Sequence, residues 1–75
     1  MKSYQFTAQI DKDKETGLYF AHVPSLPGAH TQAKTLDELS LNLKEVIELC
    51  LEELTEEEIK NLPEFIGMQQ VNIEV

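Results

Sequence analysis

The fold of this 75-residue chain is decided by the stretch from Val23 to Glu38, V-P-S-L-P-G-A-H-T-Q-A-K-T-L-D-E. Proline fixes its own φ angle and favours extended backbone in the residue before it, whereas glycine tolerates a positive φ angle. Pro24, Pro27 and Gly28 therefore predict a chain reversal that follows a strand ending at Val23. The stretch closes with the opening of a long helix.

Two strands are predicted before this reversal and one after it. Residues 3–10 alternate polar and apolar side chains, as in a half-buried strand, and the charged residues 11–17 end in glycine, as in a hairpin connection. Residues 18–23 are bulky on both faces, which predicts a strand inside the sheet with packing on each side. Residues 29–33 form a short third strand, antiparallel to the second and suited to a sheet edge.

Four polar or reactive side chains have alternative interpretations. Asp11 and Asp13 suit a plain turn, although two carboxylates in a D-x-D pair also suit a divalent cation. His22 suits a hydrogen-bonded structural role, with a ligand or proton-transfer role as the alternative. Cys50 falls on the apolar face of the predicted helix and suits a small core residue, with a reactive thiol as the alternative.

Two capping boxes predict two consecutive helices, the first from Thr35 to Glu38 and the second from Thr55 to Glu58. The second helix is expected to run to about Asn61. At 100° per residue, the apolar residues of the first helix fall within an arc of roughly 140°, wide enough to cover a sheet face. They are Leu36, Leu39, Leu43, Val46, Ile47, Cys50, Leu51 and Leu54.

Residues 68–75 alternate again and predict a last strand with Val71, Ile73 and Val75 facing inward. The predicted fold class is therefore α+β, with a three-stranded antiparallel sheet, a long helix, a short helix and a final strand. The whole chain, residues 1–75, is expected to form one domain.

Length and composition restrict the function. A chain this short buries only about 60% of its extended-chain surface, so we expect a homodimer, a higher homo-oligomer or a partner protein to complete the core. With 14 acidic residues against 6 lysines, the net charge of −8 opposes direct binding of nucleic acid. No signal peptide and no apolar run near ~20 residues is present, which predicts a soluble cytoplasmic protein without membrane contact. No cofactor, metal site or catalytic residue is expected.

The chain resembles the N-terminal domain of HicB-like antitoxins, the small antitoxins of toxin–antitoxin pairs. The resemblance extends from Tyr4 to Val75, and its most specific residues are P-S-L-P-G at Pro24–Gly28, then Thr31, then T-L-D-E at Thr35–Glu38. It implies a sheet backed by a helix, like part of a ribonuclease H fold. It also implies a HicA-like partner, a small basic messenger-RNA interferase that is masked by occupation. Many relatives add a C-terminal DNA-binding domain, so we expect no operator binding by this chain alone.

Two sets of residues are candidates for contact with a partner or a second subunit. The first set is the loop after the second strand, namely Pro24, Leu26, Pro27, Gly28 and His30, for which a rigid turn is the alternative interpretation. The second set projects from the first helix, where Glu45, Glu48, Glu52 and Glu53 supply negative charge and Leu41 and Leu49 supply apolar contact. An ordinary solvated helix face is the alternative for this set.

Three functions stay open at this stage. The first is an antitoxin or antitoxin-like binding module, and the second is a solitary homo-oligomeric regulatory domain without a toxin partner. The third is a residual ribonuclease H-like nuclease, which needs several carboxylates around divalent metal. The predicted first strand offers Gln5, Thr7 and Gln9 at the corresponding interior positions, and Asp11 only at its end.

Overall fold

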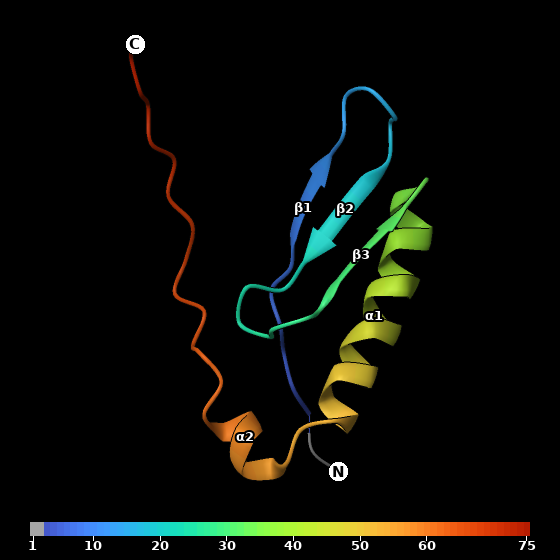
Figure 1. Cartoon of the computed structure of the whole chain (residues 1–75), viewed down its shortest axis with the longest axis vertical. Helices are drawn as coiled ribbons and strands as arrows, with labels where there is room; N and C mark the ends of the chain where they lie inside the picture. Colours follow the sequence, from blue (N-terminus) through green and yellow to red (C-terminus); the bar gives the residue numbers. More distant parts are fainter. Residues whose placement is uncertain (1–2) are drawn as a thin grey trace.

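The computed structural model describes residues 3–75 and contains three short strands followed by two helices (Figure 1). The strands are β1 (Gln9–Lys12), β2 (Tyr19–His22) and β3 (His30–Ala33), and the helices are α1 (Leu36–Glu52) and α2 (Glu56–Lys60). The strands form one antiparallel sheet in the order β1-β2-β3. The predicted α+β class, the three-stranded antiparallel sheet and the edge position of the third strand are therefore confirmed.

β1 begins and ends later in the chain than predicted. Gln9 lies opposite His22 and Lys12 lies opposite Tyr19, so the pairing with β2 covers only four residues. Because the chain leaves the sheet after His22 to enter the turn, residues 3–8 have no strand beside them and lie outside the ladder. The predicted strand over residues 3–10 is wrong in its bounds. The connection is correspondingly shorter and is closed at Gly17 with φ +76°.

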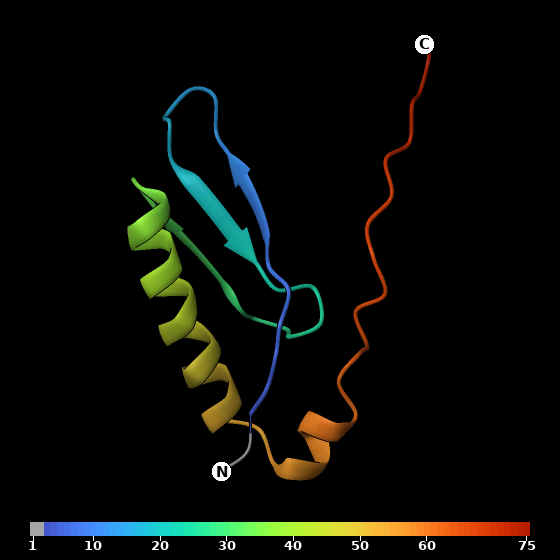
Figure 2. The ribbon, with the colours of Figure 1, turned by 180° about the vertical axis from the view of Figure 1, so that it is seen from behind.

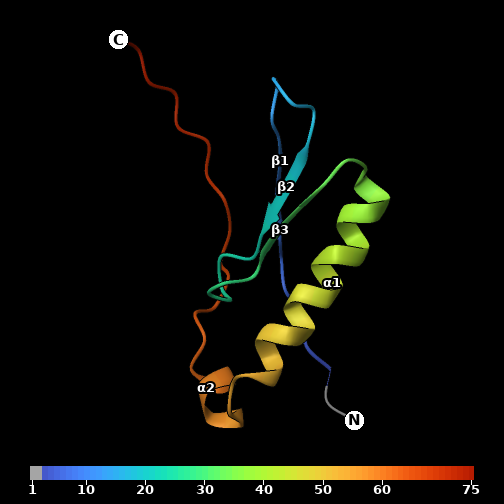
Figure 3. The same cartoon turned by 45° about the vertical axis from the view of Figure 1, so that its right-hand side comes forward.

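α1 covers one face of the sheet, where it packs over β2 and β3 (Figure 3). Leu39 is fully buried there with Ala21 and Ala33, and the side chains of Tyr19 and Leu43 pack against this group. The other face of β2 is exposed, because the described chain places no second helix over it. The prediction that the second strand is packed on both sides is therefore wrong.

A second core cluster joins the turn after β2 to the C-terminal half of α1. Val23, Leu26 and Ala29 are buried in it, and Ile47 and Cys50 of α1 pack against them. The predicted apolar stripe of the long helix is confirmed from Leu39 onward. Leu39 is buried, and the stripe residues from Leu43 to Leu54 are half-buried. Leu36 is an exception because it is the first residue of α1, ahead of the first side chain that reaches the sheet, and its side chain is exposed.

Side-chain hydrogen bonds fix the start of both helices. The Thr35 hydroxyl oxygen accepts a hydrogen bond from the Glu38 backbone N–H at 3.1 Å. In α2 the box is complete: the Thr55 hydroxyl oxygen accepts from the Glu58 N–H at 3.1 Å, and the Glu58 carboxylate accepts from the Thr55 N–H at 3.0 Å. The backbone hydrogen bond from Thr55 lowers the pKa of the Glu58 carboxyl. In the β1–β2 connection, the Thr16 hydroxyl similarly lowers the pKa of Asp13 by donating to its carboxylate at 2.6 Å.

The C-terminal tail, residues 63–75, has no regular secondary structure, and its last part runs away from the sheet (Figures 1 and 2). The predicted last strand over residues 68–75 is therefore wrong for the single chain. A strand requires a neighbour for its backbone N–H and C=O groups. The last backbone hydrogen bond of the described chain joins Leu62 to Ile59, so residues 63–75 make none with the other described residues.

Removal of the Leu26 side chain tests the second core cluster. Leu26 is 1% exposed, so Leu26→Ala should lower the free energy of unfolding by about 2–5 kcal/mol, because it removes buried apolar contacts and leaves a cavity. Leu41→Ala is the matched control on the exposed face of α1, and it should change the free energy by no more than about 0.5 kcal/mol. Urea denaturation measures both. Equal effects would contradict this assignment of the core.

The Thr55–Glu58 box predicts a specific pH dependence. Because the folded-state pKa of Glu58 is lowered, its carboxylate contributes stability that is fully present above the ordinary value of 4.5 and is lost as the pH falls through the lower folded-state pKa. The Tm of Glu58→Gln should therefore lie below that of the wild type at neutral pH, and the difference should shrink in acid. Glu57→Gln, outside the box, is the control. A Tm difference for Glu58→Gln that is independent of pH would contradict this role.

Candidate functional site

The turn after β2 is held by its own backbone hydrogen bonds. The Val23 N–H donates to the Ala29 carbonyl at 2.9 Å, and the N–H groups of Leu26 and Ala29 donate to the carbonyls of Val23 and Leu26, each at 3.1 Å. Gly28 has φ +84°, a conformation that side chains with a Cβ atom rarely adopt. These bonds make the segment a compact turn with an inner and an outer side.

The candidate loop residues divide between the two sides of this turn. Leu26 points into the core and serves the packing of the turn on α1. Pro24, Pro27, Gly28 and His30 are exposed. The rigid-turn interpretation therefore describes Leu26, whereas contact with another molecule stays a prediction for the exposed four.

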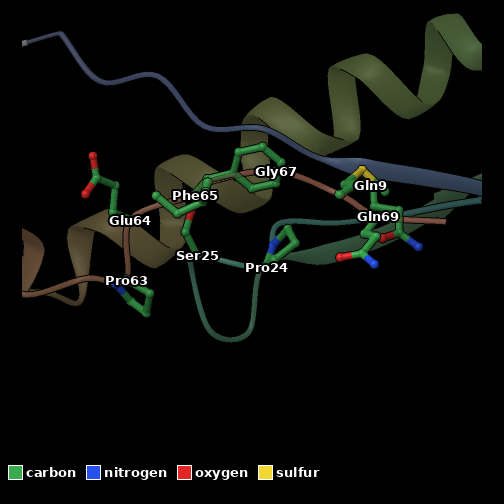
Figure 4. A pocket seen from close by; sticks show the side chains of 10 residues that line it. Gln9, Pro24, Ser25, Pro63, Glu64, Phe65, Gly67 and Gln69 are labelled. Atoms are coloured by element: carbon green, nitrogen blue, oxygen red, sulfur yellow. The ribbon is translucent and has the colours of Figure 1, made fainter. Parts of the chain in front are cut away.

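A shallow cavity separates the turn from the C-terminal tail. It has a volume of about 460 Å³ and is lined by Gln9 of β1, by Pro24 and Ser25 of the turn, and by tail residues from Pro63 to Gln69. Figure 4 shows the side chains of the turn and of the tail around this space. The start of the tail thus stays near the sheet, and the rest of the tail leaves it.

A second cavity brings one predicted acidic residue beside the turn. Glu53, which caps α1, lines a space of about 570 Å³ together with Pro27, Gly28 and the half-buried Cys50. Glu58 lines the same space, and the backbone hydrogen bond from Thr55 lowers the pKa of its carboxyl. This meeting of the end of α1 with the turn joins part of both candidate sets into one acidic surface.

The remaining acidic candidates lie on the outer face of α1, away from the turn. At 100° per residue, they project within an arc of about 100° on the side opposite the buried stripe. The members of this outer face are Leu41, Glu45, Glu48, Leu49 and Glu52, and all are exposed. Leu41 and Leu49 are 67% and 60% exposed, which is high for leucine side chains. The three carboxylates have no hydrogen bond or ion pair with the described residues.

The bare face of the sheet carries residues that the sequence did not single out together. His22 and His30 lie directly opposite each other on β2 and β3, and they line a hollow of about 470 Å³ with Phe20 and Gln32. The sequence feature that could have indicated this face is the spacing of Phe20 and His22 by two residues, which puts both side chains on one side of the strand. Within residues 3–75, no three histidine, cysteine, aspartate or glutamate side chains are arranged to hold a metal ion.

Neither helix of the described residues is long and apolar enough to cross a membrane.

Comparison with known proteins gives full-length relatives. A UPF0150 protein from Archaeoglobus fulgidus is 52% identical over 71 residues, which cover 92% of this chain and 94% of the relative. A UPF0150 protein from Synechocystis is 45% identical over 71 residues, with 95% of this chain and 97% of the relative covered. A UPF0150 protein from Thermotoga maritima is 45% identical over 69 residues, with 92% and 89% covered.

No family model matches the sequence, and no solved structure matches it significantly. The three relatives nevertheless share almost the whole length of the chain at 45% identity or more. Identity at this level over nearly the full length is sufficient to assign a family. The chain belongs to the UPF0150 family.

Proposed function

We propose that this protein is an antitoxin-like binding module that masks a small basic RNA-cleaving protein of the HicA type. The observation that carries the proposal is the outer face of α1, where the exposed carboxylates of Glu45, Glu48 and Glu52 surround the exposed side chains of Leu41 and Leu49. The resemblance of the Pro24–Gly28 turn and the following helix to HicB-like antitoxins supports the same function.

The composition of this face suits a cationic protein surface. Exposed carboxylates raise the rate of encounter with a positively charged partner through long-range attraction. Leu41 and Leu49 are eight residues apart on the same side of α1, so they supply two apolar contacts about 12 Å apart along the helix axis. Burial of these leucines in the complex would strengthen the glutamate–cation pairs around them, because water would be displaced from the interface.

The mechanism that we infer is competitive masking without chemistry. An RNA-cleaving enzyme binds the phosphate backbone with lysine and arginine side chains. The carboxylates of α1 would neutralise these same side chains, and the bound chain would cover them sterically. The toxin would then lose access to its substrate while its own active site stays intact.

A specific observation also favours the alternative function of a self-associating regulatory domain without a toxin partner. The C-terminal tail exposes Ile66, Val71 and Ile73, each by more than half of its surface. Such apolar exposure suits contact with another protein chain. Self-association through the tail does not by itself oppose toxin binding, because the tail and the outer face of α1 are separate surfaces; the two functions differ in whether a toxin partner exists.

Charge reversal on α1 tests the proposal with a matched control. The double variant Glu45→Lys plus Glu52→Lys should slow association with a basic HicA-type protein, sought in the neighbouring reading frame, by roughly tenfold or more, because it removes local attraction. The control, Glu15→Lys plus Glu57→Lys, makes the same change in net charge at exposed positions outside α1 and the tail, and it should slow association far less. Surface plasmon resonance measures both rates at several salt concentrations.

An RNA-cleavage assay with the same purified protein measures masking directly. The wild-type chain should inhibit cleavage at equimolar ratio, and the Glu45→Lys plus Glu52→Lys variant should need a clearly higher ratio. The proposal is contradicted if the wild-type chain neither binds the neighbouring basic protein nor slows its cleavage of RNA. It is also contradicted if the two double variants weaken binding equally, because net charge alone would then explain the effect.

A further inference from the structure

The single chain exposes far more surface than a folded monomer of its mass. Its accessible surface is 6557 Å², whereas a compact monomer of 8.6 kDa exposes about 4700 Å². Its radius of gyration is 14.4 Å, against about 11 Å for a compact domain of this length. The C-terminal tail contributes to this shape, since its last residues extend away from the sheet (Figures 1, 2 and 3).

The tail has the sequence pattern of a strand but lacks a neighbour. Val71, Ile73 and Val75 alternate with Gln70, Asn72 and Glu74, and all six side chains are exposed. Val71 and Ile73 are 65% and 73% exposed. Residues 65–73 carry no charge, in a chain whose net charge is −8. This stretch is therefore a place where two copies can approach each other without strong repulsion.

The sheet offers an open edge that matches this strand. β1 pairs with β2 on one side only, so its other edge presents unpaired backbone groups. Ile10 of β1 lies on the same side of the sheet as Ala21, but α1 packs over β2 and β3, and Ile10 stays exposed. Next to it, Tyr4 and Phe6 line a groove of about 800 Å³ along Leu43, Ile47 and Leu51 of α1. The apolar side of an added strand would extend this partly covered surface.

We propose that residues 68–75 of one copy add as a fourth strand to the open edge of β1 in a second copy. Residues 68–75 of the second copy add in the same way to β1 of the first. Val71, Ile73 and Val75 then face the side of the sheet that carries α1, beside Ile10. Gln70, Asn72 and Glu74 face the bare side of the sheet. The inference is independent of the proposed antitoxin function, because it uses neither the outer face of α1 nor a toxin.

A second copy of this chain fits the open edge better than an unrelated protein. Each chain has one unpaired strand and an open β1 edge, so a reciprocal exchange satisfies both and closes as a two-fold dimer. The surface excess of roughly 1900 Å² per chain is larger than the about 800 Å² per partner that a stable interface needs. The edge of β3 is less suitable, because Ala33 on its α1 side is already buried beneath α1.

Point variants of the full chain test whether the tail forms this strand and which of its two sides packs against the partner. Size-exclusion chromatography with light scattering should give a dimer for the wild type at micromolar concentration. Val71→Lys plus Ile73→Lys should raise the dimer dissociation constant by roughly a hundredfold or more, because the lysines replace the apolar contacts. Gln70→Lys plus Asn72→Lys adds the same charge to the opposite side of the strand and should leave the dimer largely intact. Circular dichroism checks that both variants keep the helices.

Nuclear magnetic resonance on a mixture of isotope-labelled and unlabelled wild-type chains tests the exchange without any variant. Contacts between the tail and β1 should appear between chains. A wild-type monomer, a dimer that both double variants weaken equally, or tail–β1 contacts found only within one chain would each overturn the proposal. If the Val71→Lys plus Ile73→Lys variant unfolds, the mixed-label measurement alone decides the question.

Discussion

The packing of one helix on one side of a three-stranded sheet is the constraint on which the structure depends. Leu39 anchors the N-terminal half of α1 on Ala21 and Ala33, and Leu26 anchors the turn on the C-terminal half of the same helix. These two leucines are the largest fully buried side chains of the described residues. Since the one long helix covers only one side of the sheet, the other surfaces of the described chain stay uncovered, and many apolar side chains remain exposed on them.

This one-sided packing leaves three different surfaces exposed. The outer face of α1 combines carboxylates with Leu41 and Leu49, the bare face of the sheet carries His22 and His30, and the β1 edge stays unpaired next to an unpaired tail. The first surface suits a basic partner, and the edge with the tail suits a second copy. A dimer built through the tail would present two acidic helices on one particle. This arrangement would increase the local concentration of carboxylates that a basic protein meets.

Local rules predicted much of this architecture from the sequence. Pro24 and Gly28 predicted the turn, Thr35 and Thr55 predicted the starts of both helices, and the helical period placed Leu41 and Leu49 on the exposed face. These features depend on backbone preferences and on hydrogen bonds between residues a few positions apart. They are therefore readable without knowledge of the tertiary structure.

The features that sequence reasoning missed all depend on which neighbours the chain brings together. The strand over residues 3–10 had the right alternation, but β2 is too short to pair with its first part. Phe20 suggested a covered second face, and no element of the described chain lies over it. The meeting of Glu53 with Pro27 and Gly28 depends on the angle at which α1 reaches the turn. The buried role of Leu26, which the sequence left open beside partner contact, also depends on this packing.

The last strand is the most informative of these differences. The alternation of Val71, Ile73 and Val75 predicts a strand, yet one chain alone gives it no partner. An alternating pattern that is unpaired in the single chain is what we expect of a strand that finds its neighbour in a second copy, as proposed above. On this account the protein is completed by self-association, and its acidic helix is left free for a partner.

Amide hydrogen exchange, followed residue by residue across a range of protein concentrations, tests this account most directly. Amides within residues 69–75 should exchange slowly in concentrated samples, and their protection should fall together with the dimer fraction on dilution. Amides of Leu39 and Leu43 in α1 should depend less on concentration. Exchange of the tail amides at the rate of an unstructured peptide, in samples where the protein is dimeric, would contradict the account.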